Sequence, residues 1–256
     1  MGSSRLPGKV LKSILGRPML QHMIERLAGS DTLDELVIAT TVKPGDDVLE
    51  DFAKRQRVGC FRGSEEDVLA RVRQAARQSA AAVIVKLSGD NPIYHPEFVD
   101  PIVRHFLDGT FDFVSNTAMG FSDKWREERT WPIGTGVSVF RTELLDRFDE
   151  AELDQADREH VIKYVIDRPD RFRLGAFQAE GACAVYARPE LRFAVDTEAD
   201  FEFIARLFEA LYPSQPAFTL GDAIRYLDAD PEVRQTNAHV RQRMLTDTAS
   251  EAKPVR

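Results

Sequence analysis

The sequence predicts an α/β domain with a mainly parallel β-sheet, and three observations lead to this fold class. Short apolar runs alternate with amphipathic stretches along most of the chain, a pattern typical of parallel sheets covered by helices. Aspartates follow two of the apolar runs. The 256 residues, 43% hydrophobic and 30% charged, can bury one large core. We expect a single domain over residues 1–245 and a flexible tail over 246–256.

Amphipathic stretches predict the helices. From Arg17 to Ala28 apolar side chains recur on one face, with Pro18 near the first helical position and Gly29 as the end. Ser64 with Asp67 resembles a capping pattern before a second helix. Further helices are expected near 96–108, 157–167 and 198–211.

Short apolar runs predict the strands. LVIAT at 36–40 and AVIVKL at 82–87 give the strongest signals, because both are continuous and rich in β-branched residues. Weaker strands are expected at DFVS (112–115), GVSVF (136–140), FRLGAF (172–177) and LRFAV (191–195). Ligands of such sheets bind at the carboxyl ends of the strands, so the residues after each run are the first candidates for a site.

Composition limits which binding partners and which cellular location are expected. A net charge of −8 argues against a general nucleic-acid binder. No apolar stretch is long enough to insert into a membrane and the N-terminus lacks a secretory leader, so a cytoplasmic protein is expected. Cys60 and Cys183 are expected to be reduced thiols in or near the core. The first 24 residues carry four cations and no acid, which suits a small phosphorylated ligand.

The segment GSSRLPGK at 2–9 is the candidate phosphate loop, because it places the cations Arg5 and Lys9 on a loop that contains Gly2 and Gly8. It is not a P-loop. Five residues separate Gly2 from Gly8, and Val10 follows the lysine where a P-loop needs Ser or Thr. The alternative is a surface turn with solvated cations.

Two aspartates are candidates for a magnesium site. Asp90 follows AVIVKL and Asp196 follows LRFAV, so both stand at strand ends, and carboxylates are ligands that Mg²⁺ prefers. The alternatives are a helix cap at Asp196 and a simple turn at Asp90. The long connection at 117–132 mixes cations with aromatic side chains and is either a lid over this site or a surface excursion.

Seven blocks together resemble one known family. They are MGSSRLPGKVL, GRPMLQHMIERL, FRGSEEDVL, LSGDNP, DFVSN, DREHV and VDTEADFEFI. In order and spacing they resemble cytidylyltransferases of the spore coat polysaccharide type, which are similar to the acylneuraminate and ketodeoxyoctonate cytidylyltransferases. The resemblance covers about residues 1–210.

The resemblance implies a nucleotide-diphospho-sugar transferase-like, Rossmann-like fold. It further implies a Mg²⁺-dependent homodimer that transfers CMP from CTP to an acidic acceptor, a sugar acid or a phosphonate, and releases pyrophosphate. The implied nucleotide-binding residues are Gly2, Ser3, Ser4, Arg5 and Lys9, with Arg62, Gly63 and Ser88 near the base or ribose. The implied catalytic residues are Arg5, Lys9, Asp90 and Asp196, the two aspartates holding the metal.

The acceptor side is predicted from cations and polar groups opposite the nucleotide. The candidates are Asn116, Arg158 and His160, with Arg126 and Arg129 in the long connection. An exposed helix ion pair is the alternative for Arg158, and a structural hydrogen bond is the alternative for His160.

Two departures from the family are visible. Members usually carry a leading strand before the GSSRLPGK block, so we expect that extending the reading frame upstream reveals one and that a chain starting at Met1 is destabilised. Ile133, Gly136 and Ser138 also stand where relatives often have acidic residues, which affects the acceptor side. Two alternatives follow: a non-catalytic member that binds nucleotide or a partner enzyme, and a transferase that uses another nucleoside triphosphate.

Overall fold

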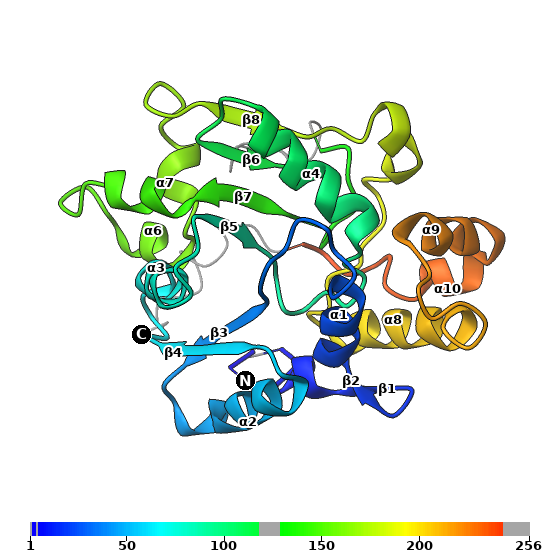
Figure 1. Cartoon of the computed structure of the whole chain (residues 1–256). Helices are drawn as coiled ribbons and strands as arrows, with labels where there is room; N and C mark the ends of the chain where they lie inside the picture. Colours follow the sequence, from blue (N-terminus) through cyan, green and yellow to red (C-terminus); the bar gives the residue numbers. More distant parts are fainter. Residues whose placement is uncertain (1, 4, 118–128, 243–256) are drawn as a thin grey trace, which may run out of the picture.

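The structure is a computed structural model in which residues 2–3, 5–117 and 129–242 are described (Figure 1). The strands are β1 (Ser13–Ile14), β2 (Arg17–Pro18), β3 (Val37–Thr41), β4 (Gly59–Gly63), β5 (Val83–Lys86), β6 (Phe113–Ser115), β7 (Ser138–Arg141) and β8 (Leu174–Ala176). The α-helices are α1 (Met19–Leu27), α2 (Asp47–Gln56), α3 (Val68–Gln78), α4 (Pro96–Asp108), α6 (Gln155–Glu159), α7 (Lys163–Ile166), α8 (Glu198–Leu211), α9 (Leu220–Ala229) and α10 (Pro231–Gln235). Short 3₁₀ helices are η1 (Lys9–Leu11), η2 (Pro44–Asp46), η3 (Thr142–Arg147) and η4 (Gly181–Tyr186).

The strands form a mainly parallel arrangement with one reversed strand. β3 and β4 pair in parallel over their full lengths. The larger sheet has the order β5-β7-β6-β8, in which β6 and β8 are parallel and β7 runs against both of its neighbours. β5, β6 and β8 therefore point the same way, and their carboxyl ends meet at one edge. The predicted α/β fold class is confirmed.

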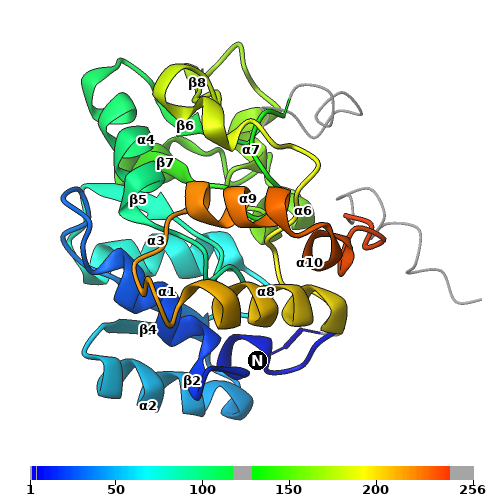
Figure 2. The same cartoon turned by 90° about the vertical axis from the view of Figure 1, so that its right-hand side faces the viewer.

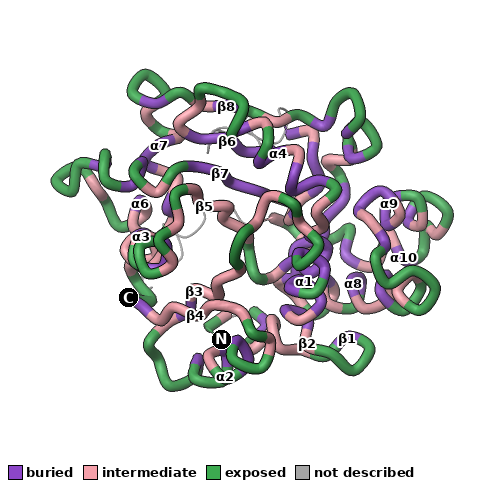
Figure 3. The backbone as a smooth tube through the Cα atoms, in the orientation of Figure 1, coloured by how far each residue is buried: buried purple, intermediate pink, exposed green. Residues whose placement is uncertain are grey.

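The sheet is divided between β3 and β5, which lie nearest each other across the division in Figure 1. Within the described residues, β3 pairs only with β4 and β5 pairs only with β7. Figure 3 shows the same division in burial, since β6 and β7 are largely buried whereas β3, β4 and β5 are half-buried. The upstream strand stays a prediction.

The helices build the core on which the site rests. The larger apolar cluster joins α1, α4, α8 and α9, and Figure 2 shows α9 lying above α8. A second cluster packs α3, α7 and η3 against β6 and β7. Trp131 is fully buried in the larger cluster, where it stacks on Tyr186.

Most predicted elements form, with three corrections. The helices at 96–108 and 198–211 have the predicted bounds. Ser64 is not the cap of α3, because Asp67 holds that position and accepts the backbone N–H of Ala70 at 2.7 Å. The stretch 157–167 contains two short helices, α6 and α7.

The third correction concerns LRFAV, which forms no regular strand. Its one recorded bridge joins Arg192 to Ile133, while the backbone N–H of Phe193 donates to the Ile133 carbonyl at 2.8 Å. The predicted tail at 246–256, Ser4, Arg126 and most of the predicted lid lie outside the described residues.

Candidate functional site

The N-terminal loop presents its two cations from a tight turn. Gly8 has a left-handed backbone, with φ of 69°, and begins η1. The Ser3 hydroxyl accepts the backbone N–H of Leu6 at 3.3 Å, and the Leu6 side chain is buried. The loop is therefore anchored by one apolar side chain and one local hydrogen bond, and the cations of Arg5 and Lys9 extend from it.

Lys9 joins the two predicted metal-binding aspartates. Its ammonium donates to Asp90 Oδ2 at 2.8 Å and to Asp196 Oδ1 at 2.9 Å. Arg5 Nη2 lies 3.2 Å from the same Asp196 oxygen. The side chains are 12% exposed at Lys9, 22% at Asp90 and 17% at Asp196, so this cluster of two cations and two anions is mostly shielded from water but open at its surface.

Backbone contacts explain why the aspartates meet. Asp90 lies shortly after β5, and the backbone N–H of Val195 donates to the Asp90 carbonyl at 3.0 Å. The next residue along the chain is Asp196. Ser88 also donates its hydroxyl to Asp90 Oδ1 at 2.6 Å, which limits the rotation of that carboxylate. Residues separated by more than 100 positions are thus placed side by side by a backbone hydrogen bond.

The electrostatics of the cluster favour an ionised Asp196 carboxylate. Burial acts to raise the pKa of Asp196, but the Lys9 hydrogen bond and the charges of Lys9, Arg5 and Arg192 outweigh it and hold that pKa below its ordinary value. Asp196 is therefore an anion at neutral pH and can bind a cation.

The two carboxylates fit a magnesium ion shared with a substrate. Both contact one ammonium nitrogen, so one small cation can reach both. The described residues contain no group of three or more His, Cys, Asp or Glu side chains arranged for a metal. Mg²⁺ is commonly held by one or two carboxylates and completed by waters and substrate phosphates, so this donor set suits it.

The other predicted nucleotide residues have mixed placements. Ser88 adjoins the cluster through Asp90. Arg62 turns toward α2, where it forms ion pairs with Asp47 at 2.6 Å and Glu50 at 3.2 Å. Gly63 is the last residue of β4, and a side chain there would meet Phe61 and Arg71. Contact of these residues with a base or ribose stays a prediction.

The predicted acceptor residues are engaged inside the protein. Asn116 is buried, donates to the Thr135 carbonyl at 3.0 Å and accepts the Val137 N–H at 2.7 Å. Arg158 forms ion pairs with Asp67 at 2.9 Å and Glu150 at 3.2 Å. Arg129 is buried and donates to the Pro189 carbonyl.

His160 is half-buried, and its pKa is lowered, first by burial and then by the charges of Lys86 and Lys163 against that of Glu159. His160 is neutral at pH 7 for this reason. An acceptor role for Asn116, Arg158 or His160 stays a prediction.

Lys86 is a further candidate site residue that was not predicted from the sequence. It is the last residue of β5, directly opposite Ser138 of β7, and it is half-buried. Burial lowers its pKa, and the charge of Asp90 opposes that shift. Lys86 forms no ion pair with a described carboxylate. The available signal was one charged residue inside the apolar run AVIVKL, on the same face as Ser88 because side chains alternate.

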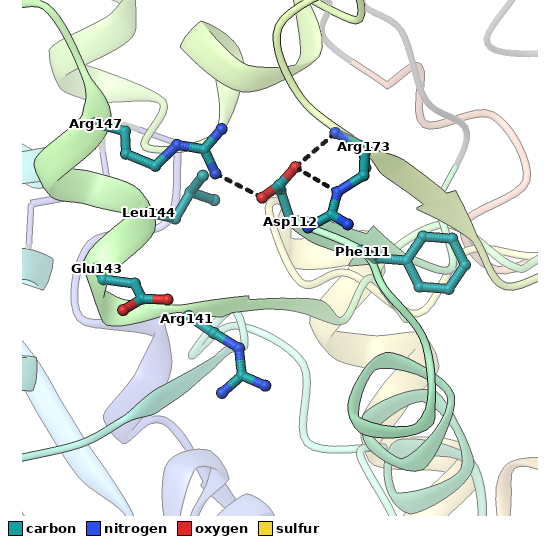
Figure 4. A pocket seen from close by; sticks show the side chains of 7 residues that line it. All are labelled: Phe111, Asp112, Arg141, Glu143, Leu144, Arg147 and Arg173. Atoms are coloured by element: carbon teal, nitrogen blue, oxygen red, sulfur yellow. Dashed lines mark hydrogen bonds and ion pairs between the residues drawn. The ribbon is translucent and has the colours of Figure 1, made fainter.

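A second charged cluster lies around Asp112 (Figure 4). A cavity of about 90 Å³ there is lined by Phe111, Asp112, Arg141, Glu143, Leu144, Arg147 and Arg173. Asp112 precedes β6 and Arg173 precedes β8, so this cluster belongs to the amino ends of the parallel strands. It is at the opposite edge of the sheet from the residues that follow β5 and β6.

Comparisons with known proteins identify the family of this chain. A family model described as cytidylyltransferase matches residues 1–239. The spore coat polysaccharide biosynthesis protein SpsF of Bacillus subtilis is 31% identical over 238 residues, 91% of this chain and 92% of the relative. The 8-amino-3,8-dideoxy-manno-octulosonate cytidylyltransferase of Shewanella amazonensis is 36% identical over 225 residues, 86% of this chain and 78% of the relative.

A solved structure is similar in fold as well as in sequence. A cytidylyltransferase from Leptospira borgpetersenii superposes with a TM-score of 0.81 at 29% identity, covering 92% of this chain and 93% of that chain. Among the described residues, no helix is long and apolar enough to cross a bilayer. The chain belongs to the cytidylyltransferase family and is a CTP-dependent nucleotidyltransferase.

Proposed function

We propose that this protein transfers CMP from CTP to an acidic acceptor of the sugar-acid class and releases pyrophosphate, for the synthesis of a surface polysaccharide or glycoconjugate. The observation that carries the proposal is the convergence of Asp90 and Asp196 on the Lys9 ammonium. Relatives support the substrate class, because one is named as a cytidylyltransferase of an octulosonate and another as a protein of spore coat polysaccharide synthesis.

The reaction is an in-line displacement at the α-phosphorus of CTP. The acceptor hydroxyl loses its proton to solvent and its oxygen forms a bond to that phosphorus while the bond to the pyrophosphate oxygen breaks, so that negative charge builds on the departing pyrophosphate. Arg5 and Lys9 extend from a loop anchored by the buried Leu6 side chain, so both charges can stabilise that group once Lys9 has left the two aspartates. Magnesium, held by Asp90 and Asp196, supplies further positive charge to the phosphate oxygens when bound.

Lys9 must change partners for this role. Its ammonium stands between the two carboxylates, where it neutralises them in the free protein. We infer that CTP phosphates draw Lys9 away from Asp90 and Asp196. The carboxylates are then free to hold the metal, and Lys9 contacts the leaving pyrophosphate.

Lys86 is the cation that we propose for the acid group of the acceptor. It lies at the carboxyl end of β5, close enough to Asp90 and His160 to exchange electrostatic interactions with both. An anion that replaces water around this half-buried ammonium gains a charge-assisted hydrogen bond. Ser138, directly opposite, brings no competing carboxylate.

Pyrophosphate release tests the proposal. Purified protein is mixed with Mg²⁺, with CTP, UTP, GTP or ATP, and with a panel of sugar acids, phosphonates and neutral sugars. Release with CTP and a sugar acid supports the proposal. Release with another nucleotide corrects the base, and release with a phosphonate corrects the acceptor class. Absence of release with every pair, while CTP still raises the melting temperature, would favour a nucleotide-binding protein without transferase activity.

A further inference from the structure

We propose that Arg192 is a positioning residue that fixes the orientation of the Asp196 carboxylate, and that Asp200 and Asn237 hold Arg192 in place. The inference deepens the proposed function and rests on it, because it concerns how tightly the metal-binding carboxylate is held. None of these three residues stood among the predicted site residues.

The two oxygens of Asp196 face different partners. Oδ2 accepts a hydrogen bond from Arg192 Nη2 at 2.6 Å. Oδ1 is directed at Lys9, 2.9 Å away, and at Arg5, 3.2 Å away. Arg192 is only 4% exposed and therefore acts from beneath the site. One oxygen is thus fixed from inside the protein, which presents the other to the cation position.

Arg192 is held by a second buried carboxylate. Its Nε donates to Asp200 Oδ1 at 2.8 Å, and Asp200 is fully buried. The other oxygen of Asp200 accepts the backbone N–H groups of Asp196 at 3.0 Å and Thr197 at 2.9 Å. Asp200 therefore fixes both the backbone that carries Asp196 and the guanidinium that orients its side chain.

Asn237, which follows α10, completes the network. Its Nδ2 donates to Asp200 Oδ1 and to the Arg192 carbonyl, each at 3.0 Å, and the residue is 3% exposed. Arg192 Nη1 also donates to Gln242 Oε1, farther along the chain. The last described segment is thereby connected to the metal-binding aspartate through a single guanidinium.

Orientation, more than stability, accounts for such a network. Well-packed apolar residues often replace a buried ion pair with no loss of stability. A guanidinium, in contrast, offers donors in a fixed fork, so it can contact two carboxylates at set angles, which a lysine ammonium cannot do. Groups that orient metal ligands typically change metal affinity or activity by about 10-fold to 100-fold when altered.

The experiment uses Arg192→Lys and Asn237→Ala in the full chain, with Arg206→Met as the control. Arg206 lies on the same helix as Asp200, is 40% exposed, and pairs with Glu202 and Glu232 away from the site. Mn²⁺ binding in the presence of CTP is followed by electron paramagnetic resonance, alongside kcat, KM for CTP and thermal melting. We expect Arg192→Lys to weaken Mn²⁺ binding and to lower kcat, each about 10-fold or more, with KM for CTP nearly unchanged.

Asn237→Ala keeps every charge. It should weaken Mn²⁺ binding and lower kcat, each by a smaller factor than Arg192→Lys does. It also keeps the test decisive if Arg192→Lys does not fold. Wild-type Mn²⁺ affinity and kcat in either folded variant would overturn the proposal. If the wild-type protein transfers no CMP, and the variants bind Mn²⁺ more weakly than wild type does, the positioning role is supported and the proposed reaction is refuted. A wild-type protein that transfers CMP without binding Mn²⁺ or Mg²⁺ would overturn the positioning role alone.

Discussion

Two aspartate clusters in this molecule have similar local chemistry and different architectures. At the candidate site, Asp90 and Asp196 share one ammonium, and a buried guanidinium supports Asp196 from below. At the other edge of the sheet, Asp112 stands alone between Arg147, 2.5 Å away, and Arg173, 3.3 Å away (Figure 4). Those arginines are 47% and 66% exposed.

The pKa shifts do not distinguish the clusters. Burial acts to raise the pKa of Asp112, but hydrogen bonds from the Arg173 backbone and from the Arg147 and Arg173 side chains hold it below its ordinary value. Asp196 is shifted in the same direction by Lys9, Arg5 and Arg192. The clusters differ in the number of carboxylates that converge on one cation and in the end of the strands that bears them. Those two features distinguish the candidate site at Asp90 and Asp196 from the cluster at Asp112, whereas a lowered carboxyl pKa is common to both.

The largest expected effect separates the two clusters by activity. Asp90→Ala, Asp196→Asn and Lys9→Ala should each lower the rate of CMP transfer by roughly 10² to 10³ or more, because each removes a charge that holds the metal or stabilises the leaving group. Asp112→Asn should leave the rate within about twofold, since that group contacts no part of the site. Pyrophosphate release by folded variants measures both. A wild-type rate in one of the first three variants would remove that residue from the mechanism.

Gly134 allows a test of how closely its own segment packs against the segment that precedes Asp196. Gly134 has φ of +92°, and a Cβ there would lie 2.3 Å from the backbone nitrogen of Ala194. Gly134→Ala should therefore lower the free energy of unfolding by about 3 kcal/mol, through backbone strain and displacement of the segment before Asp196.

Gly29→Ala is the matched control, because an added Cβ there meets nothing within 4 Å. Urea unfolding of both variants gives the comparison. Equal stabilities would show that the two segments move apart easily and that the site is less rigid than the structure indicates.

A smaller effect is expected at Lys86. Lys86→Met preserves much of the side-chain volume and removes the charge, so KM for a sugar-acid acceptor should rise about 10-fold, the loss expected for one charge-assisted hydrogen bond. KM for CTP should change little. The control is Lys54→Met on α2, an exposed lysine paired with Glu50. An unchanged acceptor KM in Lys86→Met would assign the acid-binding role to another residue.

The smallest effect concerns acid stability at Asp112. Its folded-state pKa lies below the ordinary value of 3.8, so the unfolded chain binds more protons in acid. The stabilisation is present above about pH 4 and is lost as the pH falls below 3.8 through the folded-state pKa. Between pH 6 and pH 3, wild type should lose up to about 1 kcal/mol more than Asp112→Asn in urea unfolding. Parallel pH profiles would contradict this ion-pair role.

Local sequence patterns were enough to predict the fold class and the helices at 96–108 and 198–211, and they drew attention to Arg5, Lys9, Asp90 and Asp196 as candidate site residues. These signals are local, because apolar periodicity, capping residues and turn-rich loops depend on neighbours a few positions away. Resemblance to a family added the expectation that the four charges act together.

Long-range packing established which carboxylates share a cation and which residues hold them in place. The distance between Asp90 and Asp196 depends on the hydrogen bond from Val195 to the Asp90 carbonyl, a pairing that no local pattern encodes. The same holds for Arg192, which looked like one residue of an apolar strand and is instead a buried donor to two carboxylates. Arg158 and Asn116 were predicted from their chemistry alone, and their internal partners come from segments far away in the chain. The charged side chains can be read from a sequence, but contacts between residues far apart in the chain determine which of them form ion pairs.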